Sequence, residues 1–254
     1  MKTETALLIF DPHQDTDWIR RILKQEEGRF THLLLGGDYF DAKSDRAGSL
    51  ADISGLLHEL LRDYGDNLTL LWGNHDIQYL EVIPSQRQYR NPRNQNYKIP
   101  SNYTNNRAKK LSKLLHDDLL RKGQLFAQIN GYIISHAGIA KQFWPSAISI
   151  ETSLLELKKI ADDALLNVAD RSSSLLQAGQ ARGGTQLIGG LTWLDFNEEF
   201  IDGLPWPQIF EHTPSFNNDI FSRARRNGRS WILDGGQTIY GLLRESGELQ
   251  IGSA

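Results

Sequence analysis

Short apolar runs alternate along the chain with longer segments of helical periodicity. The runs are four to six residues long, rich in aliphatic side chains and bounded by glycine or polar turns, which is typical of buried strands. Strands are expected at residues 6–10, 32–36, 68–73 and 132–135, and again from Trp231 onwards. Apolar positions recur at helical spacing in residues 15–27, 50–64, 107–122 and 151–170.

The repeated order of strand and helix predicts an α/β fold built on a sheet. The closing segment, from Trp231 onwards, has the pattern of a hairpin, in which neighbouring strands run antiparallel. We therefore expect a mixed sheet or two packed sheets, and not a purely parallel one. Residues 1–254 are predicted to form a single domain.

Two polar stretches interrupt the alternation. Residues 84–107 contain three prolines and many asparagines, and residues 171–190 are rich in Ser, Gly and Gln. Both are predicted to be long loops inserted into the domain. Loops of more than about 15 residues in a compact domain are often lids or binding loops. A tolerated surface insertion is the alternative, and the sequence favours neither.

The charges are nearly balanced, with 28 basic and 31 acidic residues and a net charge of −3. This balance gives no general electrostatic reason to expect nucleic acid or an anionic membrane as a partner, so any phosphate recognition must be local. The first apolar run has five residues, and no apolar run reaches 18, so neither a signal peptide nor a membrane span is expected. The cytoplasm is the expected location.

Cysteine is absent, which excludes disulfides and thiolate metal sites. A metal ion in this protein must therefore bind carboxylate, imidazole and amide groups.

Residues of these types follow five of the apolar runs. They are Asp11 and His13; Asp38 and Asp41; Asn74, His75 and Asp76; His136; and Glu211 and His212. Each group by itself is explained by an ordinary turn. Five groups in succession are hard to produce in that way. The carboxyl ends of strands in an α/β sheet point to one edge, so the five groups are expected to meet there.

Such a set of residues suits two divalent ions held about 3.5–4 Å apart, which need one anionic ligand to bridge them. Asp38 is the candidate bridge, because the two glycines before it let the backbone bend tightly into the site. A metal pair lowers the pKa of a shared water towards neutrality and polarises phosphoryl oxygens. The sequence therefore predicts metal-assisted hydrolysis of a phosphate ester.

Five motifs in this order resemble the calcineurin-like metallophosphoesterase superfamily. They are DxH (11–13), GDxxD (37–41), GNHD (73–76), SHAG (135–138) and EHTP (211–214). HAGI followed by Trp144, and GLTWLD ahead of HTP, resemble the phosphoprotein phosphatase branch, which includes bacterial and phage enzymes and the symmetrical diadenosine tetraphosphate hydrolases. The resemblance implies a four-layer αββα fold, in which two mixed β-sheets form a sandwich flanked by helices.

The resemblance also implies a role for each matching residue. Asp11 and His13 would bind the first metal, Asp38 would bridge, and the second metal would be completed by Asn74, His136 and His212. His75 would donate a proton to the leaving group, and Asp41 would orient it. Asp38 would thus serve the metals while Asp41 supports the catalytic imidazole. Manganese is the first expectation for both metals, with iron, zinc, magnesium and nickel as alternatives.

The chain departs from that branch at the positions of its phosphate-binding arginines. Ala42 and Gln78 stand where the branch carries cations. Guanidinium groups bind phosphate bidentately, so another residue is expected to supply the charge. Arg46 is the first candidate, and the others lie in or next to the polar insertion: Arg90, Arg93 and Arg107.

Three functions remain open on this evidence. The first is a phosphomonoesterase that acts on phosphoprotein Ser/Thr, and the second is a phosphodiesterase or dinucleoside polyphosphate hydrolase, which the missing arginines favour. A catalytically silent binding module is the third. The expected partner is a phosphorylated substrate, either a phosphoprotein or a nucleotide. The remaining histidines, His32, His58 and His116, are expected to be packing or surface residues.

Overall fold

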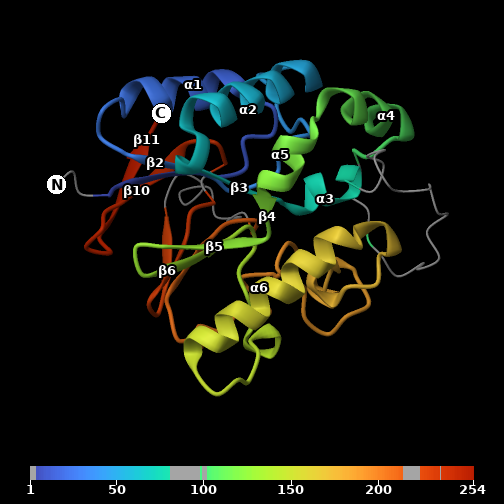
Figure 1. Ribbon diagram of the computed structural model, residues 1–254, viewed down its shortest axis with the longest axis vertical. Coiled ribbons are helices and arrows are strands. Elements are labelled where there is room, and N and C mark those ends of the chain that lie inside the picture. The colour runs from blue at the N-terminus through green and yellow to red at the C-terminus, as the bar shows by residue number, and fades with distance from the viewer. Residues whose placement is uncertain (1–3, 81–97, 99–101, 214–223, 235) are drawn as a thin grey trace.

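The computed structural model describes residues 4–80, 98, 102–213, 224–234 and 236–254. Its core is formed by a six-stranded sheet with the order β11-β10-β1-β2-β3-β4 and a five-stranded sheet with the order β5-β6-β7-β9-β8. Both sheets contain parallel and antiparallel pairs. Helices flank the sheets (Figure 1). The expected fold of two mixed sheets flanked by helices is therefore confirmed.

The first sheet brings the amino-terminal strands together. Its strands are β1 (Ala6–Ile9), β2 (His32–Leu35), β3 (Leu68–Leu71), β4 (Gly123–Gln124), β10 (Ile239–Leu243) and β11 (Leu249–Ser253). Strands β1 to β4 are parallel, and β10 pairs antiparallel with β1. The segments after β1, β2 and β3 therefore leave from one edge of the sheet.

The second sheet holds the later strands. They are β5 (Phe126–Ile129), β6 (Tyr132–Ser135), β7 (Gln208–Phe210), β8 (Arg225–Asn227) and β9 (Ser230–Ile232). Strands β6, β7 and β9 are parallel, so His136 and His212 follow two adjacent parallel strands. The expected closing hairpin is formed by β10 and β11, whereas β9, which contains Trp231, lies in the other sheet and forms a hairpin with β8.

The alternation of side chains along each strand explains the layering. Leu8 of β1 and Leu34 of β2 point to a cluster between the sheets, where Ile134 of β6 and Ile209 of β7 meet them. Their neighbours on the strands, such as Leu7, belong to the opposite cluster. Because side chains alternate between the two faces of a strand, β1 and β2 are buried on both sides.

Two helices cover the outer face of the first sheet, α1 (Thr16–Gln25) and α2 (Leu50–Tyr64), as Figure 1 shows. Trp18 and Ile22 of α1 and Leu56 of α2 belong to the cluster on that face. The start of α2 is fixed by a capping box, in which Ser49 and Asp52 each accept a backbone N–H of the other. The bounds of α2 agree with the prediction.

The helix predicted at residues 107–122 is wrong as a single element. The structure has α4 (Asn105–Leu114) and α5 (Asp117–Lys122), separated by Leu115 and His116 with extended backbone (ψ 121° and 158°). Asp117 and Asp118 then lie in the first turn of α5, where acidic side chains favour a new helix amino terminus. The helix predicted at 151–170 is observed as α6 (Ile150–Leu166), followed by a 3₁₀ turn at Val168–Asp170.

The described part of the chain includes the whole of the second predicted insertion but only a small part of the first. Of the first, residues 84–97 and 99–101 lie outside the described part of the chain, and α4 begins within its last residues. The second contains 3₁₀ turns at Ser174–Leu176 and Gln180–Arg182 and a bridge between Gly179 and Gln186. Residues 171–190 contain no α-helix or longer strand, as expected of a long loop, and the side chains of Leu175 and Leu176 in this loop are buried.

Within the described ranges, none of the helices combines the length and the apolar character that a membrane crossing needs.

Candidate active site

The segments that follow β1, β2 and β7 have unusual backbone conformations. Asp11, His13 and Asp38 have positive φ angles of 45°, 43° and 61°, and His212 has φ 79°. A residue other than glycine in the left-handed region is uncommon, costs about 1–3 kcal/mol and is found mostly at functional sites. Four of the eight described non-glycine residues with positive φ are thus residues that the sequence singled out.

Two glycines let these turns touch one another. A Cβ atom on Gly37, which has φ 102°, would lie 2.5 Å from the backbone N of Gly73. A Cβ atom on Gly73 would lie 2.1 Å from the Asp38 carboxylate. Any side chain at either position would force the two turns apart, so the expected tight bend at Asp38 has a steric cause.

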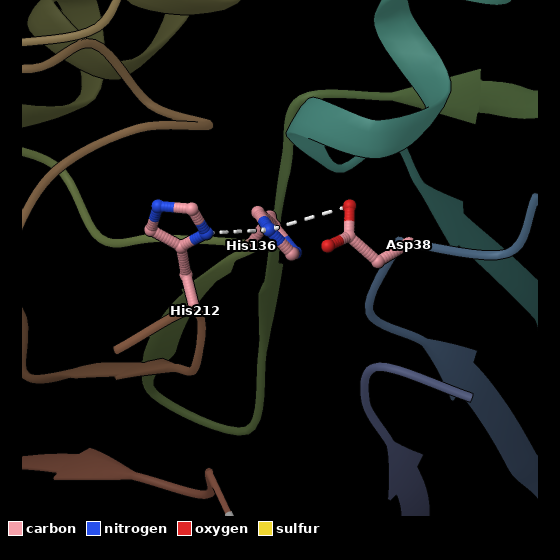
Figure 2. Close-up of side chains that lie close together, drawn as sticks. All are labelled: Asp38, His136 and His212. Atoms are coloured by element: carbon pink, nitrogen blue, oxygen red, sulfur yellow. Dashed lines mark hydrogen bonds and ion pairs between the residues drawn. The ribbon is translucent and has the colours of Figure 1, made fainter. Parts of the chain in front are cut away.

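Two groups of acidic and imidazole side chains meet at the edge of the sheets, and each is able to hold a metal ion. In the first group, His13 Nε2 lies 3.5 Å from Asp11 Oδ2 and 3.7 Å from Asp38 Oδ2. In the second, His136 Nε2 lies 3.6 Å from Asp38 Oδ1 and 3.2 Å from His212 Nδ1. Figure 2 shows His136 between Asp38 and His212. Asp38 belongs to both groups, as expected of a bridging ligand.

Asn74 and His75 begin the helix α3 (Asn74–Leu80), directly after β3. Asn74 Oδ1 lies 3.1 Å from His136 Nε2, so the amide joins the second group. The backbone N–H of His75 donates to Asp38 Oδ1 at 2.9 Å. His136 Nδ1 lies 3.0 Å from the carbonyl oxygen of Gly36, to which it donates, and Nε2 is left as an acceptor towards the group.

The donor atoms of these groups fit a divalent cation. Among the described residues, three buried atoms of these groups have no hydrogen-bond partner: Asp11 Oδ1, His13 Nε2 and Asp38 Oδ2. Unpaired buried polar atoms are costly and need an explanation, and carboxylate and imidazole atoms are ligands for Mn²⁺, Zn²⁺ or Fe²⁺.

The protonation states of the two groups suit the same role. Burial raises the pKa of Asp38, but the facing His136, His75 and His13 outweigh it, so the pKa is lowered and the carboxylate is ionised. Burial, together with His136 and Arg182, lowers the pKa of His212 well below its ordinary value. An anionic carboxylate and a neutral imidazole are the forms that bind metals.

A second arrangement lies beside the metal-binding groups. His75 Nδ1 lies 2.8 Å from Asp41 Oδ2, and Asp41 is fully buried. A carboxylate only accepts, so Nδ1 donates to it and Nε2 faces away from Asp41. Burial lowers the pKa of His75, but the charge of Asp38 and the bond to Asp41 outweigh it and raise the pKa. The His75 and His13 rings are 5.4 Å apart, which places His75 next to the first group.

Asp76 is a structural residue of the site to which the sequence assigned no role. Its carboxylate accepts the backbone N–H groups of Asp38 at 2.7 Å, Tyr39 at 2.8 Å and Gly73 at 2.9 Å. These bonds tie the turn after β2 to the turn after β3. The GNHD motif was the available signal, since a short carboxylate in a tight turn commonly accepts backbone N–H groups.

The cations near the site differ from the expected ones. Arg46 Nε lies 3.6 Å from Asp15 Oδ2, in a hollow on the side of α1 and α2. Partial burial lowers the pKa of Lys43, but the charges of Asp11 and Asp38 outweigh it and raise the pKa. Lys43 is therefore close enough to Asp11 and Asp38 to interact with their charges, and no motif drew attention to it. Arg90 and Arg93 lie outside the described residues, and Arg107 contacts Asp41 at 3.6 Å.

Residues 171–190 support the His212 turn. Arg182 Nη2 donates to the carbonyl oxygen of His212 at 3.2 Å and to Thr213 Oγ1 at 2.7 Å. Arg182 Nε is paired with Asp195 at 2.8 Å. The Trp193 ring packs edge-on against the His212 imidazole, with centroids 5.8 Å apart. This tryptophan therefore forms a wall of the site.

Comparison with known proteins adds the family and the fold. The family model of calcineurin-like phosphoesterases matches residues 7–170. Comparison by sequence with curated proteins finds no significant match.

Three solved structures illustrate the likeness in fold. A cold-active protein-tyrosine phosphatase from a psychrophilic Shewanella species has 17% identity and a TM-score of 0.61, covering 98% of this chain and 80% of its own. A serine/threonine phosphatase from Saccharomyces cerevisiae, with similarity to human PP5, has 10% identity and a TM-score of 0.53, covering 99% and 80%. A putative diadenosine tetraphosphatase has 13% identity and a TM-score of 0.52, covering 100% and 95%.

Proposed function

The chain belongs to the calcineurin-like phosphoesterase family and is a metal-dependent phosphoesterase, and we propose that within this family it acts as a Ser/Thr-type phosphoprotein phosphatase, a phosphomonoesterase. The observation that carries the proposal is the pair of buried metal-binding groups that share Asp38, with His75 and its Asp41 partner beside them. One arrangement can bind the phosphate and the other can protonate a leaving group, which are the two needs of phosphate ester hydrolysis.

The proposed ligands follow from the two groups. Asp11 and His13 would hold a first divalent ion, Asp38 would serve both ions, and Asn74, His136 and His212 would hold the second. Two cations bound in this way supply Lewis acidity, which lowers the pKa of a water molecule and neutralises charge on the phosphoryl oxygens. Manganese remains the first expectation for both, because all six ligand groups are oxygen or imidazole nitrogen.

His75 donates the proton in the proposed reaction. Its Nδ1–H is held by Asp41, and the proton on Nε2 passes to the ester oxygen as the P–O bond breaks. Water supplies the oxygen that forms the new bond to phosphorus, and His75 regains a proton from the solvent. The products are an alcohol and inorganic phosphate. The raised pKa of His75 supports this role, because it favours the protonated imidazole.

Lys43 is our proposal for the cation that meets the substrate phosphate in place of the missing arginines. Its side chain is partly exposed, and Asp11, Asp38, Glu211 and Asp234 act on its charge. A lysine holds phosphate as a single point charge, more weakly than an arginine fork. Arg46, whose guanidinium is directed at Asp15, is the second candidate.

Hydrolysis of a phosphodiester or a dinucleoside polyphosphate is the second candidate function. It is favoured by Ala42 and Gln78, which leave the positions of the usual phosphate-binding arginines uncharged. A diester carries less charge at the attacked phosphorus than a monoester and so needs fewer cations. A cytoplasmic location and a single domain remain predictions from the sequence.

One parallel assay separates these functions. The purified protein is stripped of metal, reconstituted with Mn²⁺ and given p-nitrophenyl phosphate, its bis ester, a phosphoserine peptide and diadenosine tetraphosphate, with a metal count on each sample. We expect two metals per chain and the highest kcat/KM on the phosphopeptide. A preference for the bis ester or the dinucleotide would establish the second function. Metal binding without turnover of any of the four substrates would contradict both.

A further inference from the structure

We infer that Arg107 is a positioning residue for His75, acting through Tyr79 and Asp41. This inference rests on the proposed function, in which His75 is the proton donor. Arg107 lies in the first turn of α4, 32 positions after His75, and no motif of the chain links the two residues.

The contacts of Asp41 come from two sides. Oδ2 accepts from His75 Nδ1 at 2.8 Å and from Gln78 Nε2 at 3.2 Å. Oδ1 accepts from the Tyr79 hydroxyl at 2.6 Å and faces Arg107 Nη2 at 3.6 Å. A fully buried carboxylate turns to satisfy its donors, so the groups on Oδ1 determine where Oδ2 points. The direction of Oδ2 in turn sets the plane of the His75 ring.

Arg107 controls the Oδ1 side through three contacts. Its Nε donates to the Tyr79 hydroxyl at 3.3 Å, and Nη2 donates to the carbonyl oxygen of Phe40 at 2.5 Å in addition to its contact with Asp41. The hydroxyl passes its own proton on to Asp41. A chain of hydrogen bonds therefore runs from Arg107 through the Tyr79 hydroxyl to Asp41 Oδ1. The other carboxylate oxygen, Oδ2, accepts from His75.

The start of α4 is anchored to the same loop. The Thr104 hydroxyl caps the helix by accepting the backbone N–H of Arg107 at 3.2 Å. Asn102 Nδ2 donates to the carbonyl oxygen of Ala42 at 3.2 Å. Phe40 and Ala42, the neighbours of Asp41, are thus both held from this side. The guanidinium is placed by a helix and its cap and not by a free side chain.

The alternative role for Arg107 is the one considered from sequence, a phosphate-binding cation. The two roles differ in their kinetic effect. A phosphate ligand holds every substrate alike, so its loss raises KM and affects esters with good and poor leaving groups equally. A group that positions the proton donor matters most when the leaving oxygen needs the proton, so its loss lowers kcat on esters with poor leaving groups.

The test compares Arg107→Gln with wild type on p-nitrophenyl phosphate, which has a good leaving group, and on phenyl phosphate, which has a poor one. We expect kcat on phenyl phosphate to fall by about 10- to 100-fold, as for other partners that orient a reacting imidazole. KM should change little, and p-nitrophenyl phosphate should lose much less. Lys109→Gln removes an exposed positive charge from the same helix and serves as the matched control.

Two further variants guard against a folding defect. Tyr79→Phe removes the hydroxyl between Arg107 and Asp41 and should reproduce the leaving-group effect in weaker form. Arg107→Lys keeps the charge and should recover part of the lost kcat. Circular dichroism and thermal melting of each variant show whether the fold is retained.

An NMR measurement separates this inference from the proposed function. The hydrogen-bonded Nδ1–H proton of His75 is identified by its loss in His75→Asn. It should shift or broaden in Arg107→Gln and stay in place in Lys109→Gln, whether or not the protein turns over any ester. An unchanged Nδ1–H signal in Arg107→Gln would overturn the inference. So would a rise in KM with an equal loss on both esters, which would make Arg107 a phosphate ligand.

Discussion

The two ends of strands β1, β2 and β3 place similar side chains in different surroundings. At the carboxyl ends lie Asp38 and His13, which are buried and carry polar atoms with no hydrogen-bond partner among the described residues. At the amino end of β2 lies His32, whose Nε2 lies 2.8 Å from the Thr69 hydroxyl of β3. One imidazole thus keeps a nitrogen that is able to bind a metal, and the nitrogen of the other is satisfied by its neighbour.

The backbone conformation also differs between the carboxyl and amino ends of these strands. Asp11, His13 and Asp38 have positive φ angles, whereas in the turns before β2 and β3 only the glycines Gly28 and Gly65 do. Strained turns hold ligands in place before any cation binds, which lowers the cost of ordering them on binding. The comparison indicates that position in the fold and the pairing of each ring nitrogen, and not the residue type, separate a metal ligand from a structural histidine.

A third group of histidine and acidic side chains lies at the surface. His58 of α2, His116 directly before α5, and Asp118 of α5 also lie close enough together to share a cation. His116 and Asp118 are exposed, and His58 Nε2 already lies 3.1 Å from the carbonyl oxygen of Leu114. The expectation that His58 and His116 are surface or packing residues agrees with these contacts.

Asp38→Asn should have the largest effect, because Asp38 is common to both groups. The amide removes the negative charge that faces both ions, so we expect the metal count to fall from two towards none and turnover to fall to the level of the stripped protein. Metal analysis after dialysis and a phosphatase assay measure both. Asp45→Asn, on the exposed part of the same loop, is the control. Two metals retained in Asp38→Asn would show that it does not bridge.

His75→Asn should have the second largest effect on turnover, and the variant should keep both metals. The loss of a general acid should reduce kcat on a poor leaving group by on the order of 100-fold or more. Metal analysis should still give two ions per chain, which separates this variant from Asp38→Asn. Wild-type rates on phenyl phosphate would exclude His75 as the proton donor.

Gly73→Ala tests the close contact of the two turns. The new Cβ would overlap the Asp38 carboxylate, so we expect a loss of about 1–3 kcal/mol in the free energy of unfolding and weaker metal binding. Gly55→Ala in α2 is the matched control, because a Cβ there meets no atom within 4 Å. The control should gain about 1 kcal/mol from helix propensity and keep its metals. Urea unfolding and metal titration of both variants measure these effects. If Gly73→Ala were as stable as wild type, the close contact would not require glycine at this position.

His32→Asn should have the smallest effect and none on turnover. Burial lowers the pKa of His32 in the folded state. The neutral ring therefore contributes stability above the unfolded pKa of about 6.5, and this contribution is lost as the pH falls through the lower folded value. Urea unfolding between about pH 7.5 and 5.5 should show a smaller loss of stability on acidification in His32→Asn than in wild type. A steeper loss in the variant would reverse the sign of the assigned shift.

Several features of the fold could be predicted because they depend on local patterns. The apolar runs located β1, β2, β3 and β6, and the periodicity of residues 50–64 located α2. The break between α4 and α5 could not be predicted, because the apolar spacing continues through Leu111, Leu115 and Leu119, and all three are buried. The short strands β4 and β8 also lacked a signal of their own, since pairing with distant strands defines them.

The sequence by itself determined the chemistry of the site. Without cysteine, and with Asp, Asn and His after successive strands, it specified a site of oxygen and imidazole ligands, and its motifs pointed to the family to which the chain belongs. These signals are local, because a strand and the turn after it are written in consecutive residues.

Only the tertiary structure decided which side chains share an atom-scale contact. Arg107 reaches Asp41 from a helix beyond an insertion, and Arg182 holds the His212 turn from a segment that was predicted to be a loop. The physical reason is that long side chains can point in many directions from the backbone. Packing against residues far away in the sequence selects one of these directions, and no local pattern records that choice.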